Sequence, residues 1–290
     1  MTQPTDLPPS SATAVLASQY SYDQLADIYN QARVDYIVPM PMNAKRMAEY
    51  VRDYDVDLNV SAVALNSEAL ELGVCMLGVR GERTWITRLG VIPERRGKRI
   101  GQFLTEQMLE NSRALRARRV QLEVIKGNTP AINLFQKLGF EPVRELMVVR
   151  RPPSIPDDSL NSSGAEVTAL ENTEIAALLH DYEHTQQVAW TEERASLMNS
   201  GNLRGLRAVL PSNESGWLIF QRLPFQLTHF VFSPSCSADL LRALLHAVHK
   251  THHAQDTKIE NLPADHIAWR VMQQFGYLEV FRRIEMYLHL

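Results

Sequence analysis

A low-complexity segment near the middle of the chain does most to limit what the chain can fold into. Residues 150–166, RRPPSIPDDSLNSSGAE, are rich in Pro, Ser, Asp and Asn and have no periodic apolar face, which favours a linker. The segment divides 290 residues into two pieces of similar length, each long enough for its own core. We therefore expect domains at 18–150 and 166–290, a linker at 151–165 and a disordered tail at 1–17.

The two halves end in the same pattern. PAINLFQKLGFEPVRELMVVR closes the first half and IAWRVMQQFGYLEVFRRIEMYL closes the second, and both are typical of a helix, a Gly–aromatic turn and a strand. Aligning Gly139 with Gly276 also aligns Phe140 with Tyr277. The shared order of elements indicates that one fold has been duplicated.

Apolar periodicity and turn residues predict the elements of the first half. We expect helices over residues 22–31, 43–53, 97–116 and 127–140, and strands over 60–66, 70–81, 84–92, 119–125 and 143–150. In the last helix, Thr129 is the expected N-cap, Pro130 suits the first helical position, and Gly139 suits a left-handed C-terminal residue. Strands and helices mixed in this order predict an α/β or α+β domain.

Composition excludes several classes of protein. The net charge is −3 and the pI is about 6.3, whereas a dedicated nucleic-acid-binding protein is usually basic. Cys75 and Cys236 lie in different halves and have no metal-ligand spacing, which favours a reducing compartment. The first 20 residues lack the pattern of a signal peptide, and no apolar run approaches the roughly 18 residues of a membrane helix. We expect a cytoplasmic protein, a monomer or a homodimer, with no membrane or nucleic-acid partner.

A cluster of cations stands where a helix begins. In GVIPERRGKRIGQFL, residues 90–104, Arg95, Arg96, Lys98 and Arg99 surround Gly97. The N-terminus of a helix is the positive end of its dipole and favours acids. A bound anion would explain why cations stand at the positive end of a helix. The open backbone amides of a helix N-terminus bind phosphate, and glycine lets the backbone come close to it.

Two common phosphate motifs do not fit this turn. A P-loop requires GxxxxGK followed by Ser or Thr, but Gly97 and Lys98 are followed by Arg99, and Ile92 stands where the first glycine belongs. The dinucleotide fingerprint GxGxxG is not supplied by Gly97 and Gly101.

The turn resembles the coenzyme A pyrophosphate loop of the GCN5-related N-acetyltransferases (GNAT), whose signature is Arg or Gln, x, x, Gly, x, Gly or Ala. Residues Arg96 to Gly101 align with it, and Arg99 stands where many members have the middle glycine. LGVIPE matches the V-x-P strand end of the family, and LEVIKGNTPAINLFQKLGF matches its downstream block of L-x-V, Asn, Ala, an aromatic and Gly-Phe. Together the blocks cover residues 84–149.

The resemblance implies two tandem GNAT-like domains, each with a mixed, mostly antiparallel twisted sheet flanked by helices. It implies transfer of an acyl group, usually acetyl, from coenzyme A to a small-molecule or peptide amine, with acetyl-CoA as co-substrate and no metal. The cofactor-binding residues that it implies are Leu89, Gly90, Val91, Arg96, Gly97, Lys98, Arg99, Ile100, Gly101, Asn128 and Phe135.

The catalytic residues are less determined. Many family members have a tyrosine seven residues after the asparagine as the proton donor to the thiolate, but Phe135 occupies that position here and cannot donate a proton. The strand before the loop contains no acid. Glu82, just before this strand, and Glu123, on the next, are therefore the candidate bases, and Glu123 can equally be a structural carboxylate paired with an arginine.

The second half lacks the loop signature. FVFSPSCSADLLRALLHAV has no glycine at the matching turn, and Asp265 replaces the asparagine. We expect a degenerate copy that does not bind coenzyme A and shapes one side of the cleft. HAVHKTHHAQD is either a metal-binding helix face or, as we favour, a solvated helix end. Residues of this half can also serve catalysis, and the candidates are Tyr182, His184 and His229.

Three functions follow from these observations. The first is an acetyl-CoA-dependent N-acyltransferase. The second is a non-catalytic acyl-CoA-binding regulatory or scaffold module, which Phe135 and the acid-free strand favour. The third is a nucleic-acid binder that uses RRGKR and RALRARR, against which the acidic overall balance argues.

Overall fold

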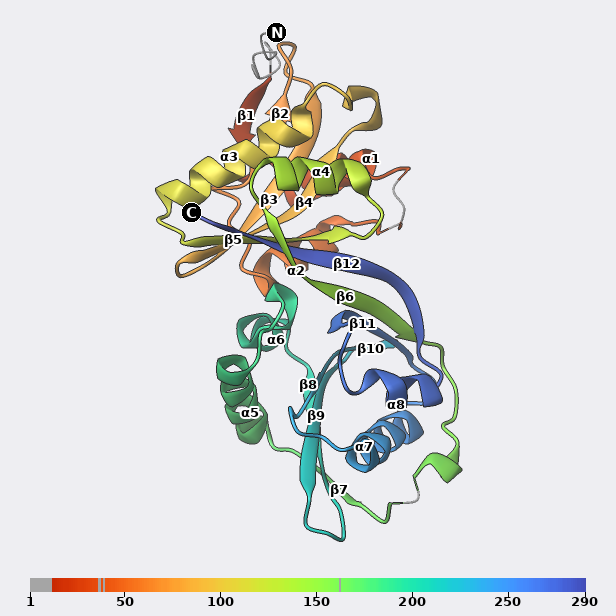
Figure 1. Cartoon of the computed structure of the whole chain (residues 1–290). Coiled ribbons are helices and arrows are strands. Elements are labelled where there is room, and N and C mark those ends of the chain that lie inside the picture. The colour runs from red at the N-terminus through yellow and green to blue at the C-terminus, as the bar shows by residue number, and fades with distance from the viewer. Residues whose placement is uncertain (1–11, 36–37, 39, 162) are drawn as a thin grey trace. The chain divides into compact units, whose positions relative to one another are not determined.

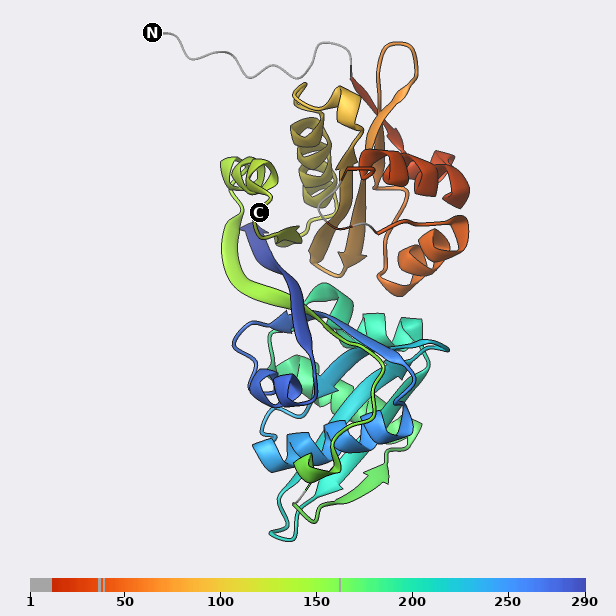
Figure 2. The ribbon, with the colours of Figure 1, turned by 90° about the vertical axis from the view of Figure 1, so that its right-hand side faces the viewer.

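The computed structural model describes residues 12–35, 38, 40–161 and 163–290, which form two compact units (Figures 1 and 2). The first unit contains residues up to 124 together with 128–143 and 285–290, and the second contains 125–127 and 144–284. The units differ from the domain boundaries 18–150 and 166–290, because most of strand β6 (Glu141–Arg151) belongs to the second unit and the end of β12 (Leu278–His289) belongs to the first. Each half thus gives part of its last strand to the other unit.

The sheet of the first unit runs β1-β2-β3-β4-β5, followed by the end of β12. Its strands are β1 (Thr13–Leu16), β2 (Ala62–Leu65), β3 (Glu71–Arg80), β4 (Arg83–Val91) and β5 (Arg119–Ile125). The pairs from β1 to β4 are antiparallel and β4–β5 is parallel, which confirms the mixed, mostly antiparallel sheet. The expected tail 1–17 was wrong for residues 13–16, whose backbone pairs with β2. Residues 1–11 lie outside the described part.

Helices cover both faces of this sheet (Figure 2). α1 (Tyr22–Ala32) and α2 (Ala44–Asp53) lie on one face, and α3 (Ile100–Ala114) and α4 (Thr129–Lys137) lie on the other. α1 starts at a capping box formed by Ser21 and Gln24. Its apolar side chains pack with α2 and the sheet in one buried cluster, so that α1 is fixed over β3 and β4.

The strands β4 and β5 separate halfway along their length. The backbone pairs between them run from Arg83↔Arg119 to Trp85↔Gln121 and include no later described residue, although both strands continue. On its other side β4 bulges against β3, since the register moves from Met76↔Thr87 to Val74↔Gly90. Arg88, at the bulge, has φ +52°. The result is an opening between the C-terminal halves of β4 and β5.

The second unit repeats this order of elements. Its sheet contains β7 (Glu166–Ala169), β8 (Leu203–Val209), β9 (Ser215–Arg222), β10 (Gln226–Phe232) and β11 (Asp256–Pro263), and β11 pairs antiparallel with β6. Its helices are α5 (Asn172–Thr185), α6 (Arg194–Ser200), α7 (Ala238–Thr251) and α8 (Trp269–Gln274). Gly139 and Gly276 both have positive φ after a helix, at +92° and +84°, as the repeated Gly–aromatic turn predicts.

The predicted linker is held to the second unit along part of its length. Its 3₁₀ helix η3 (Asp158–Leu160) carries Asp158, whose carboxylate pairs with His246 at 2.8 Å and Lys250 at 3.0 Å on α7. His246 and His249 are both buried, and His249 contacts the Tyr277 hydroxyl at 2.9 Å. The expected solvated helix end was therefore wrong for these two histidines, which pack against η3 and the core.

Neither a membrane-spanning helix nor a metal-binding cluster occurs among the described residues. None of their helices has the length and apolar character required to cross a bilayer. Within the same residues, His, Cys, Asp and Glu form no group of three or more that could hold a metal ion.

Candidate active site

A cavity of about 550 Å³ lies in the first unit, where the end of α1, the end of β4, the basic turn and the starts of α3 and α4 meet. Most of the predicted cofactor residues line it. These are Leu89, Gly90, Val91, Arg96, Gly97, Arg99, Ile100, Gly101 and Asn128. Two predicted residues do not, since Lys98 is exposed on the turn and Phe135 is buried against Phe140. Ala32, Arg33 and Asp35 of α1 and the turn after it, which the motif did not indicate, line it as well.

The N-terminus of α3 points open amides at this cavity. Its N-cap, Arg99, has left-handed backbone, with φ +59°, and provides no side-chain cap. The first helical hydrogen bond runs from Phe103 N to Arg99 O at 3.0 Å, and the first turn of α3 contains no acid. The amides of Ile100, Gly101 and Gln102 therefore have no acceptor among the described residues. An uncapped end of a 15-residue helix is a site that favours an anion.

The two glycines at the cavity serve different purposes. A Cβ at Gly101 would meet only Leu134 and Val91 methyl groups, at 3.6 and 3.7 Å, which is ordinary contact. The fold therefore does not require glycine at position 101, whereas a ligand that approaches the helix closely does. A Cβ at Gly90 would lie 2.8 Å from the Ala32 Cβ, so that Gly90 is required for α1 to pack on β4.

Arg96 is directed at the protein and not into the cavity. Its guanidinium donates to both Asp35 oxygens, at 2.7 and 2.8 Å, and to the carbonyl of Ala32 at 3.0 Å, while its Nε donates to the carbonyl of Val91 at 3.1 Å. The hydrogen bonds from Arg96 hold the pKa of the Asp35 carboxyl below its usual value. In this structure Arg96 ties the end of α1 to the basic turn. A contact between Arg96 and the diphosphate stays a prediction.

Asn128 is the N-cap of α4. Its Oδ1 accepts a hydrogen bond from Ala131 N at 3.4 Å, with Thr129 and Pro130 at the first two helical positions. The expected cap, Thr129, was one residue late, because asparagine caps a helix better than threonine does. Asn128 therefore positions the α4 wall of the cavity.

The structure separates the two candidate bases. Glu82 lies exposed at the opposite end of β4 from the cavity and pairs with Arg118 at 2.9 Å. Glu123 is half-buried on β5 beyond the last pair with β4, and its Oε2 accepts a hydrogen bond from Trp85 Nε1 at 2.7 Å. Glu123 is thus the one of the two that lies at the opening between the strands.

Sequence reasoning missed a group of side chains on the α1–α2 face of β4. Arg88 places its guanidinium 3.9 Å from the Tyr50 ring centroid and donates to the Tyr29 hydroxyl at 3.0 Å. The Tyr50 hydroxyl is hydrogen-bonded to Thr87, and burial raises the pKa of Tyr50 to about 12. Tyrosines on two amphipathic helices match no motif, so only the packing of α1 and α2 on the bulge reveals them.

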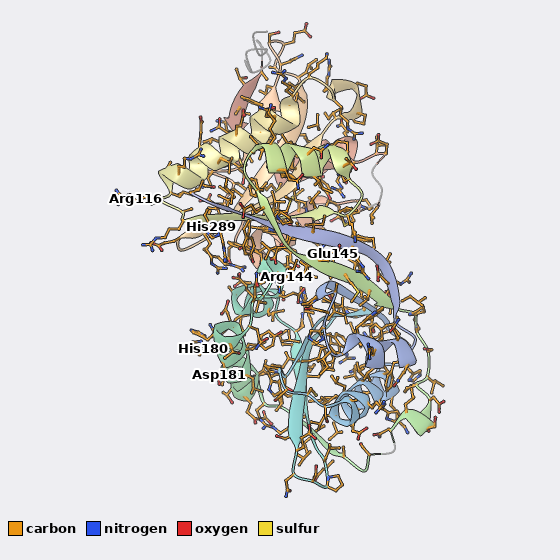
Figure 3. All side chains as sticks on the ribbon, in the orientation of Figure 1. Arg116, Arg144, Glu145, His180, Asp181 and His289 are labelled. Carbon is orange, nitrogen blue, oxygen red and sulfur yellow. The ribbon has the colours of Figure 1, made fainter. Side chains whose placement is uncertain are left out.

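The three candidates from the second half lie in the second unit. His229 is buried at a bulge of β10, with Nδ1 3.0 Å from Glu192. Burial, and then Glu192, raises the pKa of Tyr182. His184 is exposed on α5, where its Nδ1 contacts the carbonyl of His180 at 2.7 Å, and His180 and Asp181 point outward from the helix (Figure 3).

Comparison with known proteins agrees with this geometry. Residues 26–140 match the sequence profile of the Acetyltransferase (GNAT) family. A stretch of 70 residues is 34% identical to a candidate ribosomal protein bS18-alanine N-acetyltransferase of Bacillus subtilis. That stretch covers 24% of this chain and 46% of the relative, so the match spans less than half of the relative.

Solved structures resemble both units. A GCN5-related N-acetyltransferase from Sphaerobacter thermophilus has a TM-score of 0.66 at 18% identity, over 98% of this chain and 97% of that one. A tandem GNAT protein from the clavulanic acid biosynthesis pathway has a TM-score of 0.61 at 13% identity, over 96% and 98%. At such identities the likeness shows the fold, which is a tandem of two units with this architecture.

Proposed function

We propose that this chain transfers an acetyl group from acetyl-CoA to a primary amine by direct attack, on the premise that residues 26–140 match the Acetyltransferase (GNAT) family. The observation that carries the proposal is the single cavity that joins the open N-terminus of α3 to the end of the separated strand β4. One end of this cavity presents open helix amides and the other presents a strand edge without pairs to described residues. A cofactor with a charged diphosphate and a long neutral arm fits such a site.

The diphosphate end of the site would be held by backbone amides. Ile100, Gly101 and Gln102 supply them, and Gly101 leaves room for close approach. Arg99 lines the same cavity, and Lys98 stands beside it with no ion pair among the described residues. Arg96 holds the turn in place through Asp35, so its contribution to binding is structural.

The thioester end would lie along Leu89, Gly90 and Val91. Beyond Trp85 the edge of β4 that faces β5 forms no strand pairs with described residues, so a ligand can lie along it. Acetyl-CoA supplies the activated acyl group when bound. The chain supplies fixed amide donors where negative charge develops on the carbonyl oxygen, in a site that also brings amine and thioester together.

Proton removal from the amine falls to Glu123. A primary ammonium has an unperturbed pKa near 10, so the amine requires a base, either directly or through a water molecule. Glu123 stands on β5 where the strands have separated, and its carboxylate is fixed by Trp85. Since Phe135 provides no hydroxyl, we propose that solvent protonates the leaving thiolate.

Titration and turnover test this function separately. Isothermal titration with acetyl-CoA should give saturable binding near micromolar levels, and free thiol should appear when a broad panel of primary amines is added. Absence of saturable binding would reject the proposed site. Binding without thiol release over the whole panel would favour the non-catalytic acyl-CoA-binding module, for which Phe135 is the supporting observation. A cytoplasmic location and a monomeric or dimeric state stay predictions.

A further inference from the structure

Two arginines and two tyrosines form a cluster on the α1–α2 face of the first unit. In this arginine–tyrosine cluster, Arg88 lies 3.9 Å from the ring centroid of Tyr50 and 5.2 Å from that of Tyr29. Arg33 lies 5.2 Å from the same Tyr29 ring. The Tyr29 hydroxyl accepts a hydrogen bond from Arg88 Nη1, so the plane of that guanidinium is fixed. Two cations therefore share one aromatic ring, which concentrates positive charge at this point.

The cluster adjoins the thioester end of the cavity. Arg88 immediately precedes Leu89, and Leu89 and Arg33 both line the cavity. Glu123 reaches the same cluster through Trp85, whose Nε1 donates to Glu123 Oε2 at 2.7 Å and whose ring centroid lies 6.1 Å from that of Tyr50. A cation on β4 and a carboxylate on β5 thus flank one tyrosine at the opening between the strands.

The bulge does not by itself explain an arginine at position 88. Its φ of +52° is unfavourable for every residue with a Cβ and is most easily adopted by glycine. A half-buried guanidinium adds a desolvation cost to that strain. Packing of α1 and α2 against the sheet could be achieved by an apolar side chain, whereas Arg88 places a guanidinium there, held by Tyr29 and Tyr50.

We propose that Arg88 binds a carboxylate of the acceptor and that the acceptors are amino acids, with Glu123 facing the ammonium group. This inference rests on the proposed function. A planar guanidinium matches a carboxylate with two parallel hydrogen bonds, and the tyrosines that fix its plane reduce the entropy lost on binding. An amino acid carries an amine and a carboxylate close together, as the cation on β4 and the acid on β5 require.

The transfer step balances without a further reactant. The neutral amine nitrogen attacks the thioester carbonyl carbon, a C–N bond forms and the C–S bond breaks. The ammonium first gives one proton to Glu123, which passes it to solvent. After the attack the nitrogen loses a second proton to water, and the leaving thiolate takes one proton from water. The products are the N-acetyl amino acid, coenzyme A and one released proton.

The test compares each amino acid with its amide and with its decarboxylated amine, using thiol release by the full chain. The carboxylate-bearing acceptor should be preferred by about 10- to 100-fold in kcat/KM, as expected for a charge-assisted hydrogen bond. Arg88→Met should remove this preference through KM, with little change in kcat. Arg88→Lys should restore part of it. Each replacement has a Cβ, so the backbone strain at the bulge is unchanged.

Arg118→Met is the matched control, since Arg118 is an exposed arginine in the same unit whose partner is Glu82. It should leave all three substrate classes unaffected. Acetyl-CoA affinity should be equal in all variants, which shows that the cavity has kept its fold. Equal rates for an amino acid and its amide, or a preference for amides and short peptides, would overturn the inference while leaving the acyltransferase function in place.

A binding measurement keeps the two proposals distinct if no amine is turned over. Phenylalanine and phenylalaninamide are titrated into protein saturated with coenzyme A, and the same titration is repeated for each of the other amino acids with its amide. Binding that requires the carboxylate and is lost in Arg88→Met supports the inference even if the enzyme function fails. Binding that ignores the carboxylate, or no binding by any pair, rejects it.

Discussion

The two units contain the same opening between strands, and in the second unit side chains fill it. In the second unit β10 and β11 pair at Gln226↔Asp256 and Leu227↔Thr257, and no later described residues of these strands pair. A bulge follows at His229, with φ +55°, as one does at Arg88 in the first unit. The backbone arrangement that prepares a binding site has therefore been kept in both units.

Side chains close the second opening. Its 3₁₀ helix η4 (Trp190–Glu192) places Glu192 against His229 of β10 at 3.0 Å and the Thr191 hydroxyl 2.8 Å from Asn261 of β11. Trp190 is fully buried beside them. The cavity that remains has about 40 Å³, against about 550 Å³ in the first unit. The second unit thus keeps the fold of the first, while side chains occupy the opening between its strands.

The helices α3 and α7, which occupy corresponding places in the two units, differ at their N-termini. α3 has no side-chain cap and no acid in its first turn, whereas α7 is capped by Ser237 and has Asp239 in its first turn. In α7 the Ser237 hydroxyl accepts from Leu240 N, and Asp239 compensates the helix dipole. The start of α3 is therefore open to an anion, whereas the cap and the acid stabilise the start of α7.

An acid in the first turn of α3, at the position that Asp239 has in α7, should have the largest effect on acetyl-CoA binding. Gly101 and Asp239 both occupy the second helical position. Gly101→Asp should weaken acetyl-CoA binding by at least about 100-fold, because a carboxylate close to the diphosphate repels it. The same change should leave folding stability unchanged or slightly raised, since an acid suits the first turn. Titration and thermal unfolding measure the two. Gly101→Asn, which matches the size of aspartate without its charge, is the control and should weaken binding much less. Full affinity in Gly101→Asp would contradict this account.

Glu123 on β5 should matter for turnover, whereas Glu260 on β11 should matter for folding stability. Glu123→Gln should lower kcat about 100-fold or more by removing the base. Glu260 is instead paired with Lys258 at 2.6 Å and Arg283 at 2.7 Å, and these two cations lower its pKa against the opposing effect of burial. Glu260→Gln should leave kcat unchanged and destabilise the protein by about 1 kcal/mol after solvent screening. Glu82→Gln should change neither quantity. Steady-state kinetics and denaturant unfolding distinguish the three, and equal kinetics for the first two variants would reject Glu123 as the base.

Acid should destabilise the second unit through a histidine in its core. Burial lowers the pKa of His249 from 6.5 to about 3, so the unfolded chain binds a proton that the native state excludes. The stability that this group provides is complete above pH 6.5 and is lost as the pH falls from there towards 3. Between pH 7.5 and 4.5 the loss should be about 2–3 kcal/mol. His252 and His266, whose pKa values burial also lowers, act in the same direction.

His249→Gln tests this point, because glutamine keeps a hydrogen-bonding side chain near the Tyr277 hydroxyl without titrating. The variant should lose less stability between pH 7.5 and 4.5 in urea unfolding than the unchanged protein does. An identical pH dependence would show that another group controls acid unfolding.

Removing a side chain that fills the opening of the second unit should lower the free energy of unfolding and create no second binding site for acetyl-CoA. Glu192→Ala leaves buried His229 without its carboxylate partner, for a loss of about 1–3 kcal/mol. Acetyl-CoA should still bind once per chain, because α7 stays capped. A second equivalent of acetyl-CoA bound by Glu192→Ala would mean that filling alone disabled the second unit.

Local sequence determined the elements far better than the site. Strand β5 was predicted to the residue, and the helices of the first unit to within a few residues, because apolar periodicity and caps act locally. The exchange of final strands was not predictable, since either sheet offers β6 and β12 the same backbone hydrogen bonds. The edge strand β1 was missed because its four residues lie next to Pro- and Ser-rich sequence.

The parts of the site that are consecutive in sequence were predictable, and the parts that depend on packing were not. The motif located the backbone of the basic turn, because its glycines and helix start are consecutive in sequence. It could not reveal that Asp35 takes Arg96 or that Tyr29 and Tyr50 hold Arg88, since those contacts depend on how α1 and α2 pack over β4. For the same reason Glu82 and Glu123 were equivalent in sequence and are not in space.

Amide hydrogen exchange with and without acetyl-CoA tests the central claim most directly. If the uncapped amides of α3 receive the diphosphate, the cofactor should slow exchange across residues 97–103 and leave residues 237–243, at the start of α7, unchanged. Exchange that stays the same at both helix starts, or slows equally at both, would contradict the account.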